Sequence, residues 1–81
     1  MRRATTFRPG GIAFWSVDRT SGEAHVVGYS AKDANVLVIA MGSIITEMDE
    51  ANCSPTGRSE PPIGASYRRE YMKRFPGKLR G

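Results

Sequence analysis

The chain has 81 residues, with 12 Lys and Arg against eight Asp and Glu, and therefore a net charge of +4. This length allows one small domain over residues 1–81. Hydrophobic residues make up 40% of the chain and charged residues 25%, which excludes wholesale disorder. A single cysteine, Cys53, and a single histidine exclude an internal disulfide and a structural zinc site, so no metal is expected. The sequence contains no Walker loop and no dinucleotide-binding fingerprint, so no cofactor is expected either.

The apolar stretches also exclude a membrane helix and a signal peptide. The longest stretch, residues 36–45, has ten residues, whereas a membrane helix needs about 20. The run at 12–17 is interrupted by Ser16 and is too short for the apolar part of a signal peptide. We therefore expect no membrane contact and, by elimination, a cytoplasmic location.

The first part of the chain predicts a basic arm followed by a β-hairpin. Residues 1–10 contain three arginines and no acid, and a Pro-Gly-Gly sequence then breaks the chain. Residues 12–17 and 23–29 are rich in β-forming side chains and predict two strands, with 18–22 as the loop between them. Alternation along the second strand gives two faces: Ala24 and Val26 on one, and His25, Val27 and Tyr29 on the other.

A helix is expected over residues 31–50. Ser30 can cap its first turn, and Asp33 adds a negative charge near the positive end of the helix dipole. Apolar residues then recur at the spacing of a buried helical face: Leu37, Val38, Met41, Ile44, Ile45 and Met48. The β-prone residues at 36–40 favour a strand instead, so whether 36–45 is helix or strand stays open.

The remaining residues predict a loop, a second helix and a tail. Turn-forming residues dominate 53–64, which predicts a Pro/Gly/Ser-rich loop. A basic helix is expected over 65–75, followed by a mobile tail over 76–81. Together these elements predict the α+β class: a small antiparallel β-sheet, the hairpin 12–17/23–29, packed by an α-helix at 31–50, with a second basic helix at 65–75.

Charge is unevenly distributed along the chain. Residues 1–10 have three Arg and no acid, residues 31–50 have one base against four acids, and residues 61–81 have six bases against Glu70. Both ends are therefore basic and the middle is acidic. Basic ends suit contacts with a polyanion, where each neutralised phosphate releases counterions. Alternatively, the ends can pair with the acidic middle, within one chain or across a homodimer.

The basic helix at 65–75 carries an aromatic stripe. Tyr67, Tyr71 and Phe75 recur at every fourth residue and share one face. Such a stripe can dock the helix onto the sheet, or it can form a binding face for protein or nucleic acid. Trp15 is a second candidate anchor because large aromatic residues dominate binding hot spots, although a small core also needs such a residue.

Two sets of candidate binding residues follow. For a protein partner the candidates are Trp15, Tyr67, Arg68, Arg69, Tyr71, Lys73 and Arg74. For nucleic acid the candidates are Arg2, Arg3, Arg8, Arg68, Arg69, Lys73 and Arg74.

No constellation of residues predicts catalysis. Asp18, Glu23 and His25 are the one group that resembles acid–base chemistry, but the two carboxylates flank an expected hairpin loop. Ser16 and Ser21 offer hydroxyl groups, yet nothing in the sequence orients a catalytic triad. We therefore expect that the protein is not an enzyme.

The expected order of strand, turn, strand and helix over residues 11–50 resembles the fold of HicB-type antitoxins. It is also similar to several small phage inhibitor proteins. Gly28, Ser30 and Asp33 at the junction of strand and helix carry this resemblance. The Pro-Asp-Leu-Pro-Gly-like segment of the antitoxins is missing from this chain, so no function is carried over from them.

These observations favour a small non-enzymatic binding protein that regulates or inhibits a protein or nucleoprotein partner by occupying its surface. An inhibitor encoded by a phage or mobile element, such as an anti-defence protein, would fit the small size and the lack of a recognisable site. Two alternatives stay open: a small basic regulator that binds nucleic acid directly, and a non-catalytic subunit of an enzyme complex.

Overall fold

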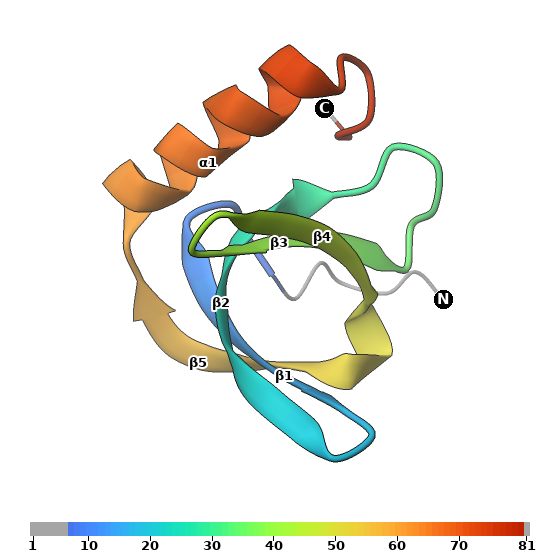
Figure 1. The fold of residues 1–81 in the computed structure, drawn as a ribbon, viewed down its shortest axis with the longest axis vertical. Coiled ribbons are helices and arrows are strands. Elements are labelled where there is room, and N and C mark those ends of the chain that lie inside the picture. The colour runs from blue at the N-terminus through green and yellow to red at the C-terminus, as the bar shows by residue number, and fades with distance from the viewer. Residues whose placement is uncertain (1–6, 81) are drawn as a thin grey trace.

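The computed structural model describes residues 7–80 (Figure 1). These residues form a five-stranded antiparallel sheet and one α-helix, so the α+β class is confirmed. The elements are β1 (Gly11–Val17), β2 (Thr20–Tyr29), β3 (Val36–Met41), β4 (Ile44–Asp49), the 3-10 helix η1 (Glu50–Asn52), β5 (Cys53–Ser59) and α1 (Pro61–Arg74).

The strand order across the sheet is β4-β3-β2-β1-β5. The first four strands follow one another as antiparallel neighbours, and β5 then crosses to pair with the free edge of β1. Figure 1 shows that the sheet curls around an interior, while α1 lies outside it along one end. Helix α1 therefore covers only part of the outer face, chiefly at β2.

The hairpin of β1 and β2 is present, with a shorter turn than the sequence predicts. Val17 pairs with Thr20, so Asp18 and Arg19 alone make the turn, and the predicted loop at 18–22 is wrong. Asp18 adopts a positive φ of +56°, a conformation that short polar side chains tolerate. Gly22 instead lies within β2, where a Cβ atom would come 3.2 Å from the Trp15 ring.

The predicted helix at 31–50 is wrong, and the alternative of a strand within 36–45 is correct. This segment contains β3 and β4, joined by a two-residue turn in which Gly42 has a φ of +62°. The strand-turn-strand-helix order that resembled the HicB-type antitoxins is therefore also absent from residues 11–50.

The error has a physical cause in the burial of β3 on both faces. The interior of the curled sheet contains Phe7, Ala13, Ala24, Val26, Tyr29, Leu37 and Ile39. A second cluster between the sheet and α1 contains Val27, Val38, Ala40 and Tyr71. Consecutive residues of β3 thus alternate between two cores. Burying each large apolar side chain of this strand contributes roughly 1.5–3 kcal/mol to the stability of the fold. A strand covered on both faces has no polar alternation that would distinguish it from a buried helix.

A bulge in β2 changes the face on which Tyr29 lies. The pairing with β3 shifts between Val26 and Gly28, which inserts one extra residue into β2. Ala24 and Val26 share the interior face, and Val27 lies on the opposite face in the cluster with α1, so the expected separation of these residues is confirmed. Tyr29, however, lies in the interior with Val26, so its predicted place on the face of Val27 is wrong.

The C-terminal third is more ordered than its composition suggests. The predicted loop at 53–64 instead contains β5 and the first turn of α1. The sequence tolerates this because β5 is an edge strand, where a proline is acceptable, and because Pro61 occupies the first helical position. Within residues 7–80 there is no second α-helix. Helix α1 includes most of the basic helix expected at 65–75, and the helix expected at 31–50 is absent.

The expected mobile tail is hydrogen-bonded to the sheet up to residue 80. The chain turns after α1, where Gly77 has a φ of +81°, and Leu79 forms an antiparallel bridge with Ser30. The Arg80 amide donates to the Tyr29 carbonyl at 2.9 Å, and the Ala31 amide donates to the Lys78 carbonyl at 2.7 Å. The tail therefore returns to the end of β2.

Candidate nucleic-acid interface

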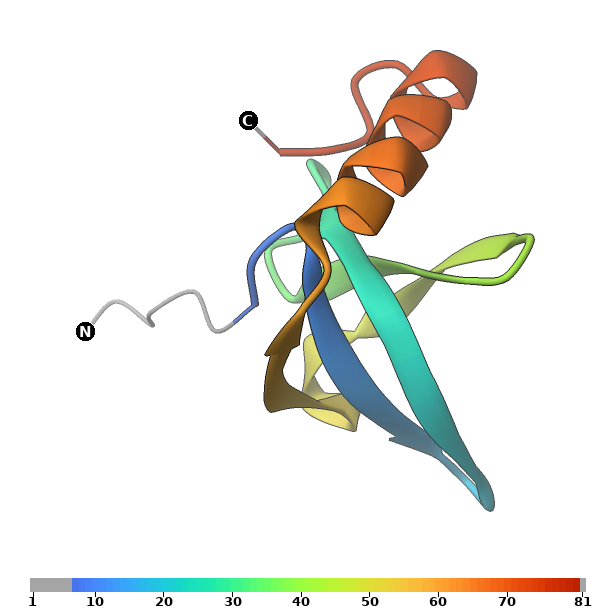
Figure 2. The same cartoon turned by 90° about the vertical axis from the view of Figure 1, so that its left-hand side faces the viewer.

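The described parts of the two basic segments, residues 7–10 and 76–80, meet at the end of β2. On one side, the Gly10 amide donates to the Val26 carbonyl at 3.0 Å, which holds the N-terminal segment against the strand. On the other side, the tail is bonded to Tyr29. Figure 2 shows both segments beside the same end of β2, with α1 next to them. Of the predicted basic arm, Arg8 lies in this region, whereas Arg2 and Arg3 lie outside the described residues.

Helix α1 approaches this region closely because two glycines face each other. A Cβ atom on Gly64 would lie 2.5 Å from the Gly10 Cα atom, so the helix rests directly on the backbone before β1. The Glu60 amide also donates to the Gly10 carbonyl at 2.8 Å. This contact fixes the helix beside the N-terminal segment and directs Arg68 toward the end of β2.

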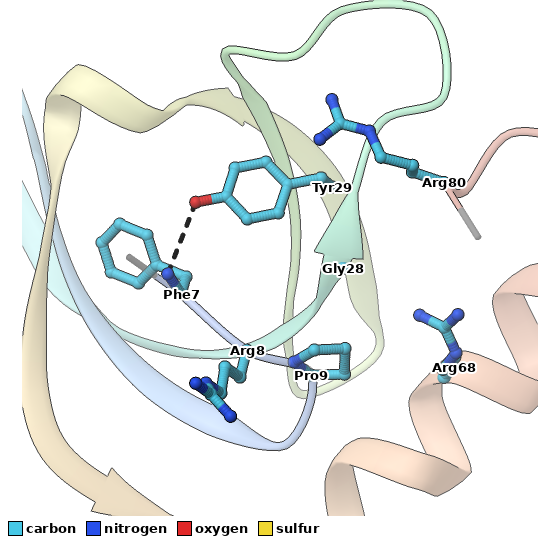
Figure 3. Close-up of a pocket in the computed structure, with 7 residues that line it drawn as sticks. All are labelled: Phe7, Arg8, Pro9, Gly28, Tyr29, Arg68 and Arg80. Carbon is cyan, nitrogen blue, oxygen red and sulfur yellow. Dashed lines mark hydrogen bonds between the residues drawn. The ribbon is translucent and has the colours of Figure 1, made fainter. Parts of the chain in front are cut away.

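A pocket of about 600 Å³ lies where these segments meet. It is lined by Phe7, Arg8, Pro9, Gly28, Tyr29, Arg68 and Arg80 (Figure 3), and we call it the arginine pocket. Its three arginines come from the N-terminal segment, from α1 and from the tail. No acidic residue of the described chain lines it.

Arg68 is positioned by the bulge in β2. Its Nη1 atom donates a hydrogen bond to the Val27 carbonyl at 3.0 Å, on the bulged residue itself. Gly28 makes room for it, because a Cβ atom there would lie 2.8 Å from Nη1. Gly28 also has a φ of +155°, which side chains rarely allow. The glycine therefore supports both the bulge and the place of the guanidinium.

Tyr29 and Arg80 form the opposite wall. The Tyr29 hydroxyl donates to the Glu50 carboxylate, and the Phe7 amide donates to the Tyr29 hydroxyl at 3.4 Å. The Arg80 guanidinium carbon lies 5.4 Å from the centre of the Tyr29 ring, a cation–π contact. Buried hydrogen bonds thus fix the ring, and the ring in turn supports the guanidinium.

The arginine pocket brings three cations together with no carboxylate among its lining residues. Elsewhere, Arg58 forms an ion pair with Glu23, and Arg74 pairs with Glu70 at 3.2 Å. Within residues 7–80, no ion pair joins Arg8, Arg68 or Arg80 to a carboxylate. Three cations around one concave surface repel one another unless an anion lies between them. The arrangement therefore favours an anionic ligand.

The other basic candidates lie along the outside of α1. Arg69 and Lys73 are exposed, and neither forms an ion pair within the described chain. Arg74 is exposed but is paired with Glu70 one turn earlier. Arg69 and Lys73 are thus cations unpaired within the described residues, on the exposed part of α1, and Arg74 contributes less.

The aromatic stripe of α1 mainly docks the helix. The Tyr67 hydroxyl donates to the Gly42 carbonyl at 2.8 Å, and its ring lies 5.5 Å from the His25 ring. Tyr71 is only 5% exposed and belongs to the outer core cluster. Phe75 is 45% exposed and lies 5.0 Å from the Tyr71 ring. Of the three rings, Phe75 offers the most surface to a partner.

Trp15 packs against the interior cluster, half-buried. Its Nε1 atom is buried and has no hydrogen-bond partner within the described chain. Trp15 therefore packs within the protein itself and is not an exposed anchor for a partner.

The candidate acid–base residues are dispersed. Asp18 lies in the turn between β1 and β2, and Glu23 is paired with Arg58. His25 lies instead beside Tyr67, with its Nε2 atom 3.7 Å from the Glu60 carboxylate. Within residues 7–80, no group of three or more His, Cys, Asp or Glu side chains could hold a metal ion.

The sequence reasoning missed Gly28, Tyr29 and Arg80 as site residues. An isolated glycine within a predicted strand is a signal for a bulge or for a close contact, and Gly28 is both. Nothing in the sequence pairs Tyr29 with Arg80, because their contact depends on the return of the tail to β2.

Comparison with protein families, with curated proteins and with solved structures finds no match to this chain. None of the helices in the described part is long and apolar enough to cross a membrane.

Proposed function

We propose that the protein is a small non-enzymatic binding protein that recognises nucleic acid, free or within a nucleoprotein, through the arginine pocket. By occupying the surface of this partner, the protein would regulate or inhibit the partner. Such a partner is compatible with the cytoplasmic location expected from the sequence.

One observation carries the proposal: Arg8, Arg68 and Arg80 line one pocket and form no ion pair with a carboxylate of the described chain. Phosphate groups are the natural counterpart, because guanidinium groups bind phosphate oxygens in a bidentate geometry. Exposed Arg69 and Lys73, on the same helix as Arg68, offer further cations for contact with several phosphates.

Docking of a protein partner through aromatic anchors has less support. Of the anchors expected for it, Tyr71 belongs to the core and Trp15 packs against the interior cluster. Hot-spot residues act by entering a pocket of the partner, which a residue of the core cannot do without leaving it. Arg8, Arg68 and Arg80, in contrast, already line the pocket and can contact a ligand without a rearrangement of the fold.

The test is a binding titration by fluorescence anisotropy with labelled single-stranded DNA, single-stranded RNA and duplex DNA. Two double variants with the same net charge are compared. The pocket variant replaces Arg8 and Arg80 with glutamine and leaves the hydrogen bond of Arg68 intact. The control variant replaces Arg19, in the β1–β2 turn, and Arg74, the partner of Glu70, with glutamine.

The wild-type protein should bind at least one of these nucleic acids, with an affinity that falls as salt rises. On a single strand each lost phosphate contact lowers the salt slope by about 0.7, so the pocket variant should lose about 1.4. Raising the salt from about 50 to about 200 mM should therefore reduce the affinity of the wild-type protein roughly sevenfold more than that of the pocket variant. The control should change the slope much less. If the wild-type protein binds none of the three at low salt, the proposed function is wrong; equal effects of both variants would exclude the pocket as the contact.

A further inference from the structure

We propose that the arginine pocket receives one unpaired nucleotide, so that the protein prefers single-stranded nucleic acid to a duplex. This inference rests on the proposed function and adds the kind of nucleic acid and the way it is bound. Three features of the pocket support it: its concave shape, the position of its charges and the chemistry of its floor.

The shape of the pocket suits a nucleotide better than a duplex. A volume of about 600 Å³ lies within the range that encloses small organic ligands, roughly 300–1,000 Å³. The bases of a duplex are stacked inside it and show only their edges in the grooves, so a duplex presents a convex row of phosphates. A duplex would therefore leave the pocket empty unless a base were extruded, which costs a few kcal/mol of stacking and pairing.

The charges lie around the pocket rather than at one point. Figure 3 shows Arg8 beside Pro9, Arg68 on the side of α1 and Arg80 above Tyr29. A single small anion would be best bound by guanidinium groups that converge on it. Groups on separate sides instead match a strand, in which phosphates flank each base on both sides.

The floor between these charges offers a planar group on which a base can stack. It is lined by Pro9, by the backbone at Gly28 and by the small exposed parts of Phe7 and Tyr29, which belong to the interior cluster. The planar group is the Arg80 guanidinium, which is exposed and whose carbon lies 5.4 Å from the centre of the Tyr29 ring. Unpaired bases stack on arginine planes as well as on aromatic rings, which a paired base within a helix cannot do.

The experiment compares three ligands of about 12 nucleotides, within the site size of small single-strand-binding folds. The first is an intact single strand, the second a strand with the same phosphates but abasic sites, and the third a blunt duplex of two complementary strands. DNA and RNA versions are tested by fluorescence anisotropy with the wild-type protein. We expect the intact strand to bind roughly tenfold or more tightly than the abasic strand and the duplex.

An R80K variant separates stacking from charge, because lysine keeps the positive charge but has no planar group. Its salt slope should equal that of the wild type, whereas its preference for the intact over the abasic strand should fall several-fold. Should the abasic strand or the duplex bind as tightly as the intact strand, the inference is overturned while the proposed function stands. No binding of any ligand would overturn both.

Discussion

Gly28→Ala tests whether the bulge in β2 holds Arg68 in place. At Gly28 the backbone has a φ of +155°, and an alanine held in such a conformation costs about 1–3 kcal/mol. The new Cβ atom would also lie 2.8 Å from the Arg68 Nη1 atom and 3.3 Å from a methyl carbon of Leu79. Arg68 would have to move, and loss of its hydrogen bond to the Val27 carbonyl adds about 1–2 kcal/mol.

The expected total loss is about 2–5 kcal/mol in the free energy of unfolding, measured by urea denaturation with the fluorescence of the single tryptophan. In thermal denaturation a chain of this size should lose about 4–8 °C in Tm for each kcal/mol. Gly57→Ala is the matched control, because Gly57 also has a positive φ, of +79°, but no atom lies within 4 Å of its Cβ position. This control should lose only about 1–2 kcal/mol, the cost of the backbone conformation.

The difference between the two variants isolates the contact with Arg68. In an Arg68→Ala background, the excess cost of Gly28→Ala over Gly57→Ala should shrink, because the clashing atom is gone. If Gly28→Ala costs no more than Gly57→Ala, or if its cost is the same with and without Arg68, the glycine does not position this arginine. The structural explanation of the pocket would then be wrong.

Two further predictions concern the helix contact and the single thiol. Gly64→Ala should destabilise the fold by about 1–3 kcal/mol in urea denaturation, because its Cβ atom would lie 2.5 Å from the Gly10 backbone. This loss should occur although alanine favours a helix over glycine by about 1 kcal/mol. A gain in stability would contradict the close packing of Gly64 on Gly10. Burial, and then the charges of Glu50 and Asp49, raise the pKa of the Cys53 thiol. Iodoacetamide at pH 8 should therefore alkylate this thiol more slowly in the folded protein than in urea, a rate that mass spectrometry can follow. An equal or faster rate in the folded protein would contradict this environment.

Local sequence patterns predicted the elements whose partners lie close in the chain. The hairpin of β1 and β2 needs only two alternating segments and a turn, and most of α1 follows from its aromatic spacing and its breaker residues. The segment 31–50 could not be resolved in this way. Its burial depends on two cores on opposite faces of β3, and one of them exists only because α1 returns to the sheet.

The candidate site was predictable in part. The sequence indicated that both ends are basic, and it named Arg8 and Arg68 among the candidates. That these ends meet is a tertiary property, which depends on the bridge between Ser30 and Leu79 and on the contact between Gly10 and Gly64. The position of Tyr29 could not be predicted by alternation, since a single extra residue in β2 reverses the face of every side chain after it.

The most direct test of the central claim is to locate the binding surface on the intact protein. Uniformly 15N-labelled protein is titrated with a short single-stranded oligonucleotide at low salt, and the backbone amide shifts are followed by NMR. The largest changes should occur at Arg8, Gly28, Tyr29, Arg68 and Arg80, and they should diminish as salt is added. Changes that are confined to the β1–β2 turn or to β4, with the amides of the arginine pocket unaffected, would contradict the account.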